Sequence, residues 1–419
     1  MLGSEDATEA LCERAIASGL AGKLTKSLMV KLLQAVRIYI NTAPLPTVIN
    51  YVDKIMKIIV PLTKYNNDAI IKAFHANEYL TEIITALDIL SAAVEKSHPS
   101  KLWETTCFTV LATGINLLFT ARTRILQNWG EAIRGDLLGL LVRMSAAVSN
   151  TKDLPDMQLR GYELVRYTLS HLLIHLSYPK VVKQLGEYSH IRNEKLANIW
   201  RSSGKMPQKR AVVREEIPGA TVCDNISCDV MKRPKRSWIC SRCVTASYCS
   251  PRCQAEDWKR FHKSECYRAK QDEIAREMTH TRYRYSDRHF QMSWAQIICN
   301  DSLPLFDRDQ LGRQAFPDHK PYEIVPIVDC TGILVPSTQV FPESLRLNPR
   351  WWVGLEGCGK EYRLVDFYFL YGSAEALSLL MLLKRLPGGF YKVAYSIPRR
   401  GVRKTTQGTW PIPKSDYDQ

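Results

Sequence analysis

The sequence predicts an α+β protein built from several domains. Three features support this fold class: apolar residues recur at helical spacing through residues 1–200, cysteines concentrate between residues 223 and 266, and residues 267–419 mix helical stretches with aromatic and β-branched runs. A chain of 419 residues is long enough for two or three domains, each with its own apolar core. We therefore expect an all-helical domain, a small cysteine-rich unit and an α+β module.

Residues 1–200 predict the all-helical domain. Apolar residues recur at the spacing of one helix face in the stretches 28–40, 70–90, 111–126, 137–148 and 159–176. Pro99 and Pro155 mark expected breaks between helices. The lengths suit either a helix bundle or a helical repeat, and no repeated signature residue decides between the two.

Residues 201–222 have the composition of an interdomain linker. The run RSSGKMPQKRAVVREEIPGA at 201–220 loses apolar periodicity and gains glycine, proline and charge. We therefore place the boundary of the helical domain at residue 200 and the start of the cysteine-rich unit at residue 223.

The chain is expected to lie inside the cell, in the nucleus, the cytoplasm or both. Acids at Glu5, Asp6 and Glu9 stand where a signal peptide would have a basic start. The longest apolar runs fall well below the roughly 18 residues that a membrane span requires, so no membrane partner is expected. In a reducing compartment cysteines seldom pair with each other, and a dense cluster of them indicates metal binding or catalysis.

The cysteine cluster predicts two zinc sites. Seven of the twelve cysteines fall within residues 223–266 and, together with one histidine, form four closely spaced pairs. The pairs are Cys223 and Cys228, Cys240 and Cys243, Cys249 and Cys253, and His262 and Cys266. Zinc takes four sulfur or nitrogen donors in a tetrahedron, and donors a few residues apart can reach one ion from a single turn. Four pairs therefore make two four-ligand sites; the alternatives are free thiols or a redox cluster.

The run YCSPRCQAEDWKRFHKSEC at 248–266 resembles the end of a MYND finger, a family of small modules that bind two zinc ions. The match covers about a tenth of the chain. It implies an interleaved set of ligands, which the spacing alone does not decide. One zinc would take Cys223, Cys228, Cys249 and Cys253, and the other would take Cys240, Cys243, His262 and Cys266.

The resemblance also implies a partner. MYND fingers bind short proline-containing peptides, and the residues that make the contact correspond here to Ser241, Gln254 and Trp258. An exposed tryptophan beside a glutamine can cover a proline ring while the amide hydrogen-bonds an extended peptide backbone. The alternative is that Trp258 only packs the small core of the finger. The gap between Cys228 and Cys240 is longer than in many members of the family and predicts a basic surface loop.

No catalytic site is predicted. One group of MYND proteins carries the finger in a SET methyltransferase domain, whose cofactor site needs an Asn-His-Ser-Cys stretch, and this tetrapeptide does not occur in the sequence. Gly354, Gly359 and Lys360 match the outline of a phosphate loop, but Glu361 stands where that loop has the Ser or Thr that ligates magnesium. The strand-like run that follows favours a glycine-rich hairpin turn.

The formal net charge of +15 suggests nucleic-acid binding, which we do not predict. The finger has nine Lys and Arg against five Asp and Glu, a charge of +4. Seven ligand thiolates add about −7 and two zinc ions +4, so the metallated finger carries about +1. The segment RYRYSDRHF at 282–290 interleaves cations with aromatic residues as single-strand binders do, but the solvated face of a helix explains it better. Basic clusters at 232–236 and 399–404 are candidate nuclear import signals or ordinary surface charge.

Residues 267–419 predict a mixed module. A mainly helical stretch is expected at 267–298, and the aromatic and β-branched content of strands appears at 322–335, 351–370 and 390–397. A further helix is expected at 374–386, capped by Ser373 and ended by Pro387 and two glycines.

The order of a helical front, a central finger and a mixed tail is similar to that of multidomain MYND proteins common in fungi. The first hypothesis is therefore an adaptor that captures a proline-containing peptide through its finger, and the family suggests transcriptional or ubiquitin-linked regulation. The second is a structural role, in which the zinc ions only join the flanking domains. The third is an uncharacterised enzyme in the carboxy-terminal module. The sequence does not indicate an oligomeric state.

Overall fold

The computed structural model describes residues 5–65, 67–97, 108–119, 124–150, 155–187, 222–228, 237–278, 282–301, 317–318, 325–331, 337–341, 361–371 and 375–402. The chain divides into two compact units. The first contains residues 1–172 and 183–202, and the second contains residues 173–182 and 203–419. The predicted linker at 201–222 lies almost wholly outside the described residues, and the predicted domain boundaries stay a prediction.

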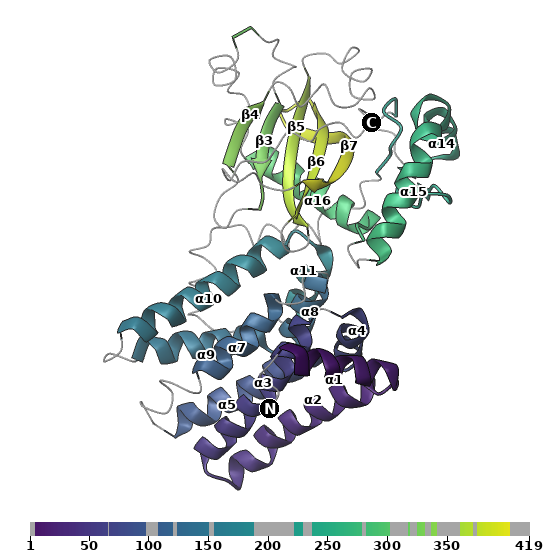
Figure 1. The fold of residues 1–419 in the computed structure, drawn as a ribbon. Helices are drawn as coiled ribbons and strands as arrows, with labels where there is room; N and C mark the ends of the chain where they lie inside the picture. The colour runs from purple at the N-terminus through teal and green to yellow at the C-terminus, as the bar shows by residue number, and fades with distance from the viewer. Residues whose placement is uncertain are drawn as a thin grey trace. The chain divides into compact units, whose positions relative to one another are not determined.

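The first unit is helical (Figure 1). Its helices are α1 (Glu5–Ala17), α2 (Ala21–Arg37), α3 (Leu45–Lys64), α4 (Asp68–Ala76), α5 (Tyr79–Lys96), α7 (Phe108–Asn116), α8 (Ile125–Arg134), α9 (Leu137–Asn150) and α10 (Pro155–His175), with α11 (Pro179–Glu187) following. The last residues of α10 and the first of α11 group with the second unit, where the Tyr178 hydroxyl donates a hydrogen bond of 2.6 Å to the Leu370 carbonyl oxygen. Among the described helices, none combines the length and the apolar character needed to cross a bilayer.

Helix α5 forms the centre of this unit. It contacts α2, α7, α8 and α9, and its residues Leu80, Leu87 and Leu90 are fully buried. Helix α7 comes close at Gly114, where a Cβ atom would lie only 2.2 Å from the Leu87 side chain. The predicted stretch at 70–90 is two helices, because Glu78 adopts a left-handed conformation with φ of 48° between them. Helices α1, α3 and α11 and most of α8 were not predicted, and the choice between a bundle and a repeat remains open.

The second unit combines the cysteine-rich segment with a sheet. A short hairpin of β1 (Trp238–Ile239) and β2 (Ser247–Tyr248) precedes α14 (Pro251–Asp257), the π-helical turn η6 (Trp258–His262), α15 (Lys263–Met278) and α16 (Tyr285–Asp301). The sheet strands are β3 (Val325–Asp329), β4 (Ser337–Phe341), β5 (Tyr362–Tyr371), β6 (Glu375–Arg385) and β7 (Tyr391–Val402). Their order is β4-β3-β5-β6-β7, and every neighbouring pair is antiparallel except β3 with β5. The predicted α+β fold class is confirmed.

Helix α16 lies against β7 (Figure 1). Asn300 accepts a hydrogen bond of 2.6 Å from the backbone amide of Tyr391, and its own amide donates to the Tyr391 carbonyl at 3.2 Å. Gln296 accepts from the amide of Val393 at 3.1 Å. A strand at the end of a sheet has unpaired amides, and here helix side chains bind two of the donors along β7.

The predicted helix at 374–386 is wrong, because this segment is strand β6. Its leucines favour a helix by propensity, but β6 pairs along its length with both β5 and β7, and consecutive residues Leu379 to Leu383 are buried. A strand covered on both faces shows a continuous apolar run with no alternation, which periodicity cannot distinguish from a buried helix. Gly388 and Gly389, with φ of 99° and 87°, form the turn into β7 and do not cap a helix. The predicted cap Ser373 lies outside the described residues.

Candidate metal centres

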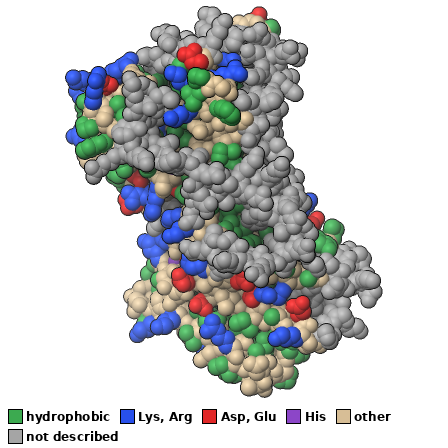
Figure 2. All heavy atoms as spheres, turned by 180° about the vertical axis from the view of Figure 1, so that it is seen from behind, with side chains coloured by type: hydrophobic (Ala, Val, Ile, Leu, Met, Phe, Trp, Pro, Cys, Tyr) green, Lys and Arg blue, Asp and Glu red, His purple; other side chains and the backbone are tan. Residues whose placement is uncertain are grey.

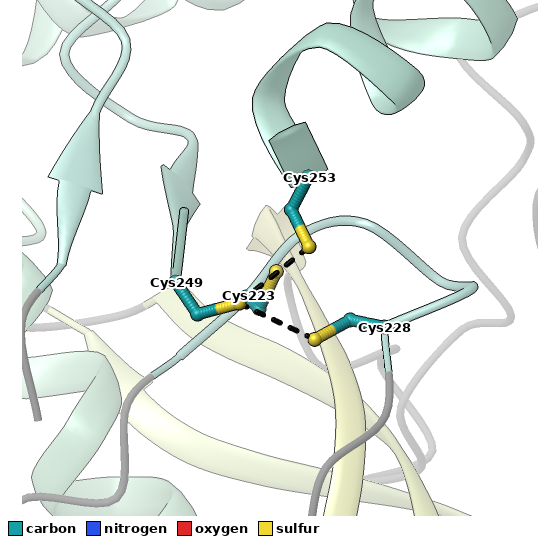
Figure 3. Close-up of side chains that lie close together, drawn as sticks. All are labelled: Cys223, Cys228, Cys249 and Cys253. Carbon is teal, nitrogen blue, oxygen red and sulfur yellow. Dashed lines mark hydrogen bonds between the residues drawn. The ribbon is translucent and has the colours of Figure 1, made fainter. Parts of the chain in front are cut away.

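Four cysteine thiols meet at one point in the second unit, as Figure 3 shows. The Sγ atom of Cys249 lies 3.4 Å from that of Cys228 and 3.5 Å from that of Cys253. Cys223 completes the group, in which all four sulfur atoms lie within 4.8 Å of one another. The thiols come from the loop 222–228, the end of β2 and the first turn of α14.

Local hydrogen bonds bring these thiols together. In the loop, the Asn225 carbonyl accepts from the Cys228 amide at 3.0 Å, and the Asn225 side chain accepts from the Ser227 amide at 3.1 Å. This tight turn returns Cys228 to the side of Cys223. Ser250 caps α14 by accepting a hydrogen bond of 3.2 Å from the amide of Cys253. A serine cap followed by a proline begins the helix directly after β2, so the last two thiols are held one turn apart.

A second group contains Cys240, Cys243, His262 and Cys266, which are all buried. The Cys240 and Cys266 sulfurs are 3.8 Å apart, and the Cys243 sulfur lies 3.5 Å from Nε2 of His262. The first two thiols lie in a knuckle after β1, closed by a hydrogen bond of 2.9 Å from the Val244 amide to the Cys240 carbonyl. His262 and Cys266 are four residues apart at the junction of η6 and α15, and therefore face the same side.

The dimensions of both groups fit zinc. Four donors at about 2.3 Å from a central ion, arranged as a tetrahedron, are about 3.8 Å from one another. Four of the ligand pairs lie 3.4 to 3.8 Å apart, close to that edge, and all ligand atoms of each group lie within 4.8 Å of one another. Sulfur and imidazole nitrogen are also the donors of structural zinc sites, and no carboxylate belongs to either described group.

The electrostatics of the two groups also favour a cation. Burial raises the pKa of Cys249 to about 11 and that of Cys266 to about 12, with neighbouring sulfurs adding to both shifts. Burial alone would raise the pKa of Cys243, but hydrogen bonds from His262 and Thr245 lower it to about 6. Thiolates this close repel each other, so a divalent ion is required for all of them to ionise together.

The spacing and geometry of these ligands agree with the comparison with protein families. Residues 222–266 match the family model of the MYND finger. A search of curated proteins and a search of solved structures each found no match. The expectation of two zinc ions is confirmed: one cluster has four cysteines and the other has three cysteines and a histidine.

The three residues predicted to bind peptide lie at the surface of the MYND finger. Ser241 is exposed in the knuckle, whereas Gln254 and Trp258 are half-buried and four residues apart along α14 and η6. The Trp258 ring packs against the core of the finger, at 5.7 Å from the His262 ring, and the Arg242 guanidinium lies 5.8 Å above its indole. Trp258 is therefore partly buried between the finger core and Arg242, which agrees with the packing alternative, and its role in peptide binding stays a prediction.

Several apolar side chains of the MYND finger were missed by the sequence reasoning. Trp238 and Ile239 of β1 are 47% and 46% exposed, and Val244 at the end of the knuckle is 55% exposed with φ of 61°. Large apolar residues next to a zinc knuckle would be expected to lie in an apolar core. In this small finger the two zinc clusters replace such a core, and the side chains of β1 are exposed to solvent.

The MYND finger is joined to the sheet through Arg288. Its guanidinium forms two hydrogen bonds with the Asp224 carboxylate, at 2.6 and 3.0 Å, and its Nε donates to the Ser396 hydroxyl at 3.0 Å. Arg288 is only 4% exposed, so the solvated helix face expected for 282–290 is wrong at this position. Sequence periodicity missed it because the ion pair joins residues 64 positions apart. The basic cluster at 232–236 lies outside the described residues.

Proposed function

We propose that the chain is an interaction adaptor whose MYND finger captures short proline-containing peptides. The contact between Arg242 and Trp258 supports this proposal best, because it brings the knuckle and the helical part of the finger together. Ser241 is exposed directly beside Arg242, and Gln254 lies one helical turn from Trp258. Indole, amide and hydroxyl groups thus share one part of the surface.

This arrangement suits an extended peptide. The exposed part of the half-buried Trp258 indole would cover a proline ring, with Arg242 moving aside, and the Gln254 amide would hydrogen-bond the peptide backbone. Trp238 and Ile239 add exposed apolar area on β1, which pairs only with β2 among the described strands. Aromatic residues with a polar neighbour are common at the energetic centre of protein interfaces.

The proposal includes the cellular setting expected from the sequence. The protein would act in the nucleus or the cytoplasm, in transcriptional or ubiquitin-linked regulation, as an adaptor and not as an enzyme. The process rests on the family resemblance alone.

Alanine substitutions in the finger test peptide capture. A panel of fluorescently labelled synthetic proline-containing peptides is titrated with the zinc-loaded full chain, and anisotropy gives the affinity. Gln254→Ala should weaken binding about three- to tenfold, since a neutral hydrogen bond contributes about 0.5–1.5 kcal/mol. Trp258→Ala should weaken it further, because the proline loses its aromatic contact.

Two controls accompany this titration. Lys259→Ala changes an exposed neighbour of Trp258 and should leave the affinity unchanged. Each variant should retain two zinc equivalents, which shows that the finger is folded. If both Gln254→Ala and Trp258→Ala bind every peptide as the unchanged chain does, with zinc retained, capture at this surface is excluded.

A structural role for the zinc ions is the second candidate, and one observation favours it. Asp224 is the neighbour of the zinc ligand Cys223, and it forms the buried ion pair with Arg288 that reaches Ser396 on β7. Ile226, in the same loop, packs against the sheet core around Leu364. The four-cysteine group therefore also positions the loop 222–228, which contacts Arg288 and the sheet core. This structural role can coexist with peptide capture.

A further inference from the structure

A second surface feature lies on α15, directly after the last zinc ligand. Tyr267, Ile274 and Met278 are 73%, 43% and 76% exposed. Their spacings of seven and four residues place them on a single face of the helix. Single exposed apolar residues are normal on a protein surface, whereas these three are aligned along one helix, with Lys270 and Gln271 between Tyr267 and Ile274. We call these three residues the α15 stripe.

The α15 stripe faces away from the finger to which the helix belongs. Cys266 is buried as a zinc ligand, Ala269 packs against the finger core, and Glu273 is buried and pairs with Arg282 at 2.7 Å. At 100° per residue, these residues lie about 100–160° around α15 from Tyr267, and therefore outside the stripe. The inner face fixes the helix to the finger, so the stripe is held in a constant position.

One flank of the α15 stripe carries a small excess of positive charge. Lys263 and Lys270 lie beside it, both exposed and with no ion pair among the described residues. Glu277 pairs with Arg282 at 3.1 Å, and the same arginine pairs with Glu273, whereas Asp272 pairs with Arg276 at 2.9 Å. Two lysines and one arginine therefore face two glutamates on this flank, which leaves a net charge of +1. On the face shown in Figure 2, Lys and Arg side chains lie beside hydrophobic ones in the part of the molecule that carries α14 and α15.

We propose that the α15 stripe docks an acidic amphipathic helix of a partner protein. A single line of three apolar side chains matches the ridge of one helix, and is too narrow for a broad apolar face. Two lysines on the same flank select a partner helix whose apolar face is bordered by Asp or Glu. The site is separate from Trp258 and Gln254, so the adaptor would hold two partners, one through an extended peptide and one through a helix.

A pair of designed peptides tests the charge preference. Both are labelled amphipathic helices with the same leucine face, one flanked by glutamates and the other by lysines, and each is titrated with the zinc-loaded full chain. The glutamate-flanked helix should bind at least tenfold more tightly, and added salt should reduce the difference. Reversing the flank with Lys263→Glu and Lys270→Glu together should invert the preference.

Variants of the α15 stripe test the apolar contact. Ile274→Ser with Met278→Ser changes two side chains away from the zinc ligands and should weaken binding of the glutamate-flanked helix at least tenfold. Leu159→Ser removes an equally exposed apolar residue from α10, 61% exposed, and should have no effect. Gln254→Ala should also have no effect, because it belongs to the other surface.

Four results would overturn the proposal. The first is equal binding of the two peptides, and the second is unchanged binding after the double serine substitution with two zinc equivalents retained. The third is self-association of the chain that the double substitution abolishes. The stripe would then be an interface between two copies of this chain. The fourth is binding to vesicles of anionic lipid that is lost in the same variant while the glutamate-flanked helix does not bind.

Discussion

The buried charge of Arg288 joins three parts of the second unit: α16, the loop 222–228 and β7. Arg288 lies on α16, pairs with Asp224 from the loop that carries two zinc ligands, and hydrogen-bonds Ser396 on β7. Burial alone would lower the pKa of the Arg288 guanidinium, but the charge and hydrogen bonds of Asp224 raise it above its ordinary value. The ion pair therefore keeps the charge stable inside the protein, and removal of either partner leaves the other buried and uncompensated.

Arg288→Met should destabilise the second unit by about 3–5 kcal/mol, the usual cost of breaking a buried ion pair by removing one partner. The measurement is urea unfolding of the zinc-loaded chain, followed by the fluorescence of tryptophan. Arg252→Met breaks the exposed pair with Glu256 on α14 and should cause no measurable change. If Arg288→Met and Arg252→Met have the same free energy of unfolding, Arg288 does not hold the loop to the sheet.

At the scale of elements, the zinc sites were predictable, whereas strand β6 was predicted as a helix and β1, β2 and β4 were not predicted. Metal ligands are recognised by residue type and short spacing, so Cys240 and Cys243 reveal their site from the sequence alone. Segment 375–385 could not be assigned in the same way, because its partners β5 and β7 are defined by long-range pairing. The exposed stripe on α15 was also missed, since an apolar helix face normally indicates a buried one.

The turn between β6 and β7 provides a test of that assignment. Gly388 has φ of 99°, and a Cβ atom there would meet only the Phe390 ring at ordinary contact distance, so Gly388→Ala adds backbone strain without a clash. It should lower the stability of the β6–β7 hairpin by roughly 1–2 kcal/mol, measured as faster amide hydrogen exchange in these strands. Gly22→Ala in α2 has open space and helical φ, and should be neutral or stabilising by up to about 1 kcal/mol. Equal effects of both substitutions would mean that the turn geometry at Gly388 is not required.

At the scale of the whole molecule, zinc should control the second unit and leave the first unit unaffected. Zinc binding contributes roughly 10–16 kcal/mol to the folding of isolated zinc-finger peptides, so a chelator should unfold the finger. In this chain the loop 222–228 also supplies Asp224 to Arg288 and Ile226 to the sheet core, contacts that depend on the position of the loop. Loss of zinc should therefore leave Arg288 buried without its partner.

The expected result is a graded loss of protection from amide hydrogen exchange after chelation. The finger should lose protection completely and α16 and β7 should lose it in part. Helix α5 should keep its protection, because it packs on α2, α7, α8 and α9 of its own unit. Restoring zinc should restore all three patterns. If α16 and β7 keep full protection while the finger exchanges freely, the Arg288 contact is not sufficient to couple the metal to the sheet. The finger would then be an independent module, and its zinc ions would serve only the surface that meets other proteins.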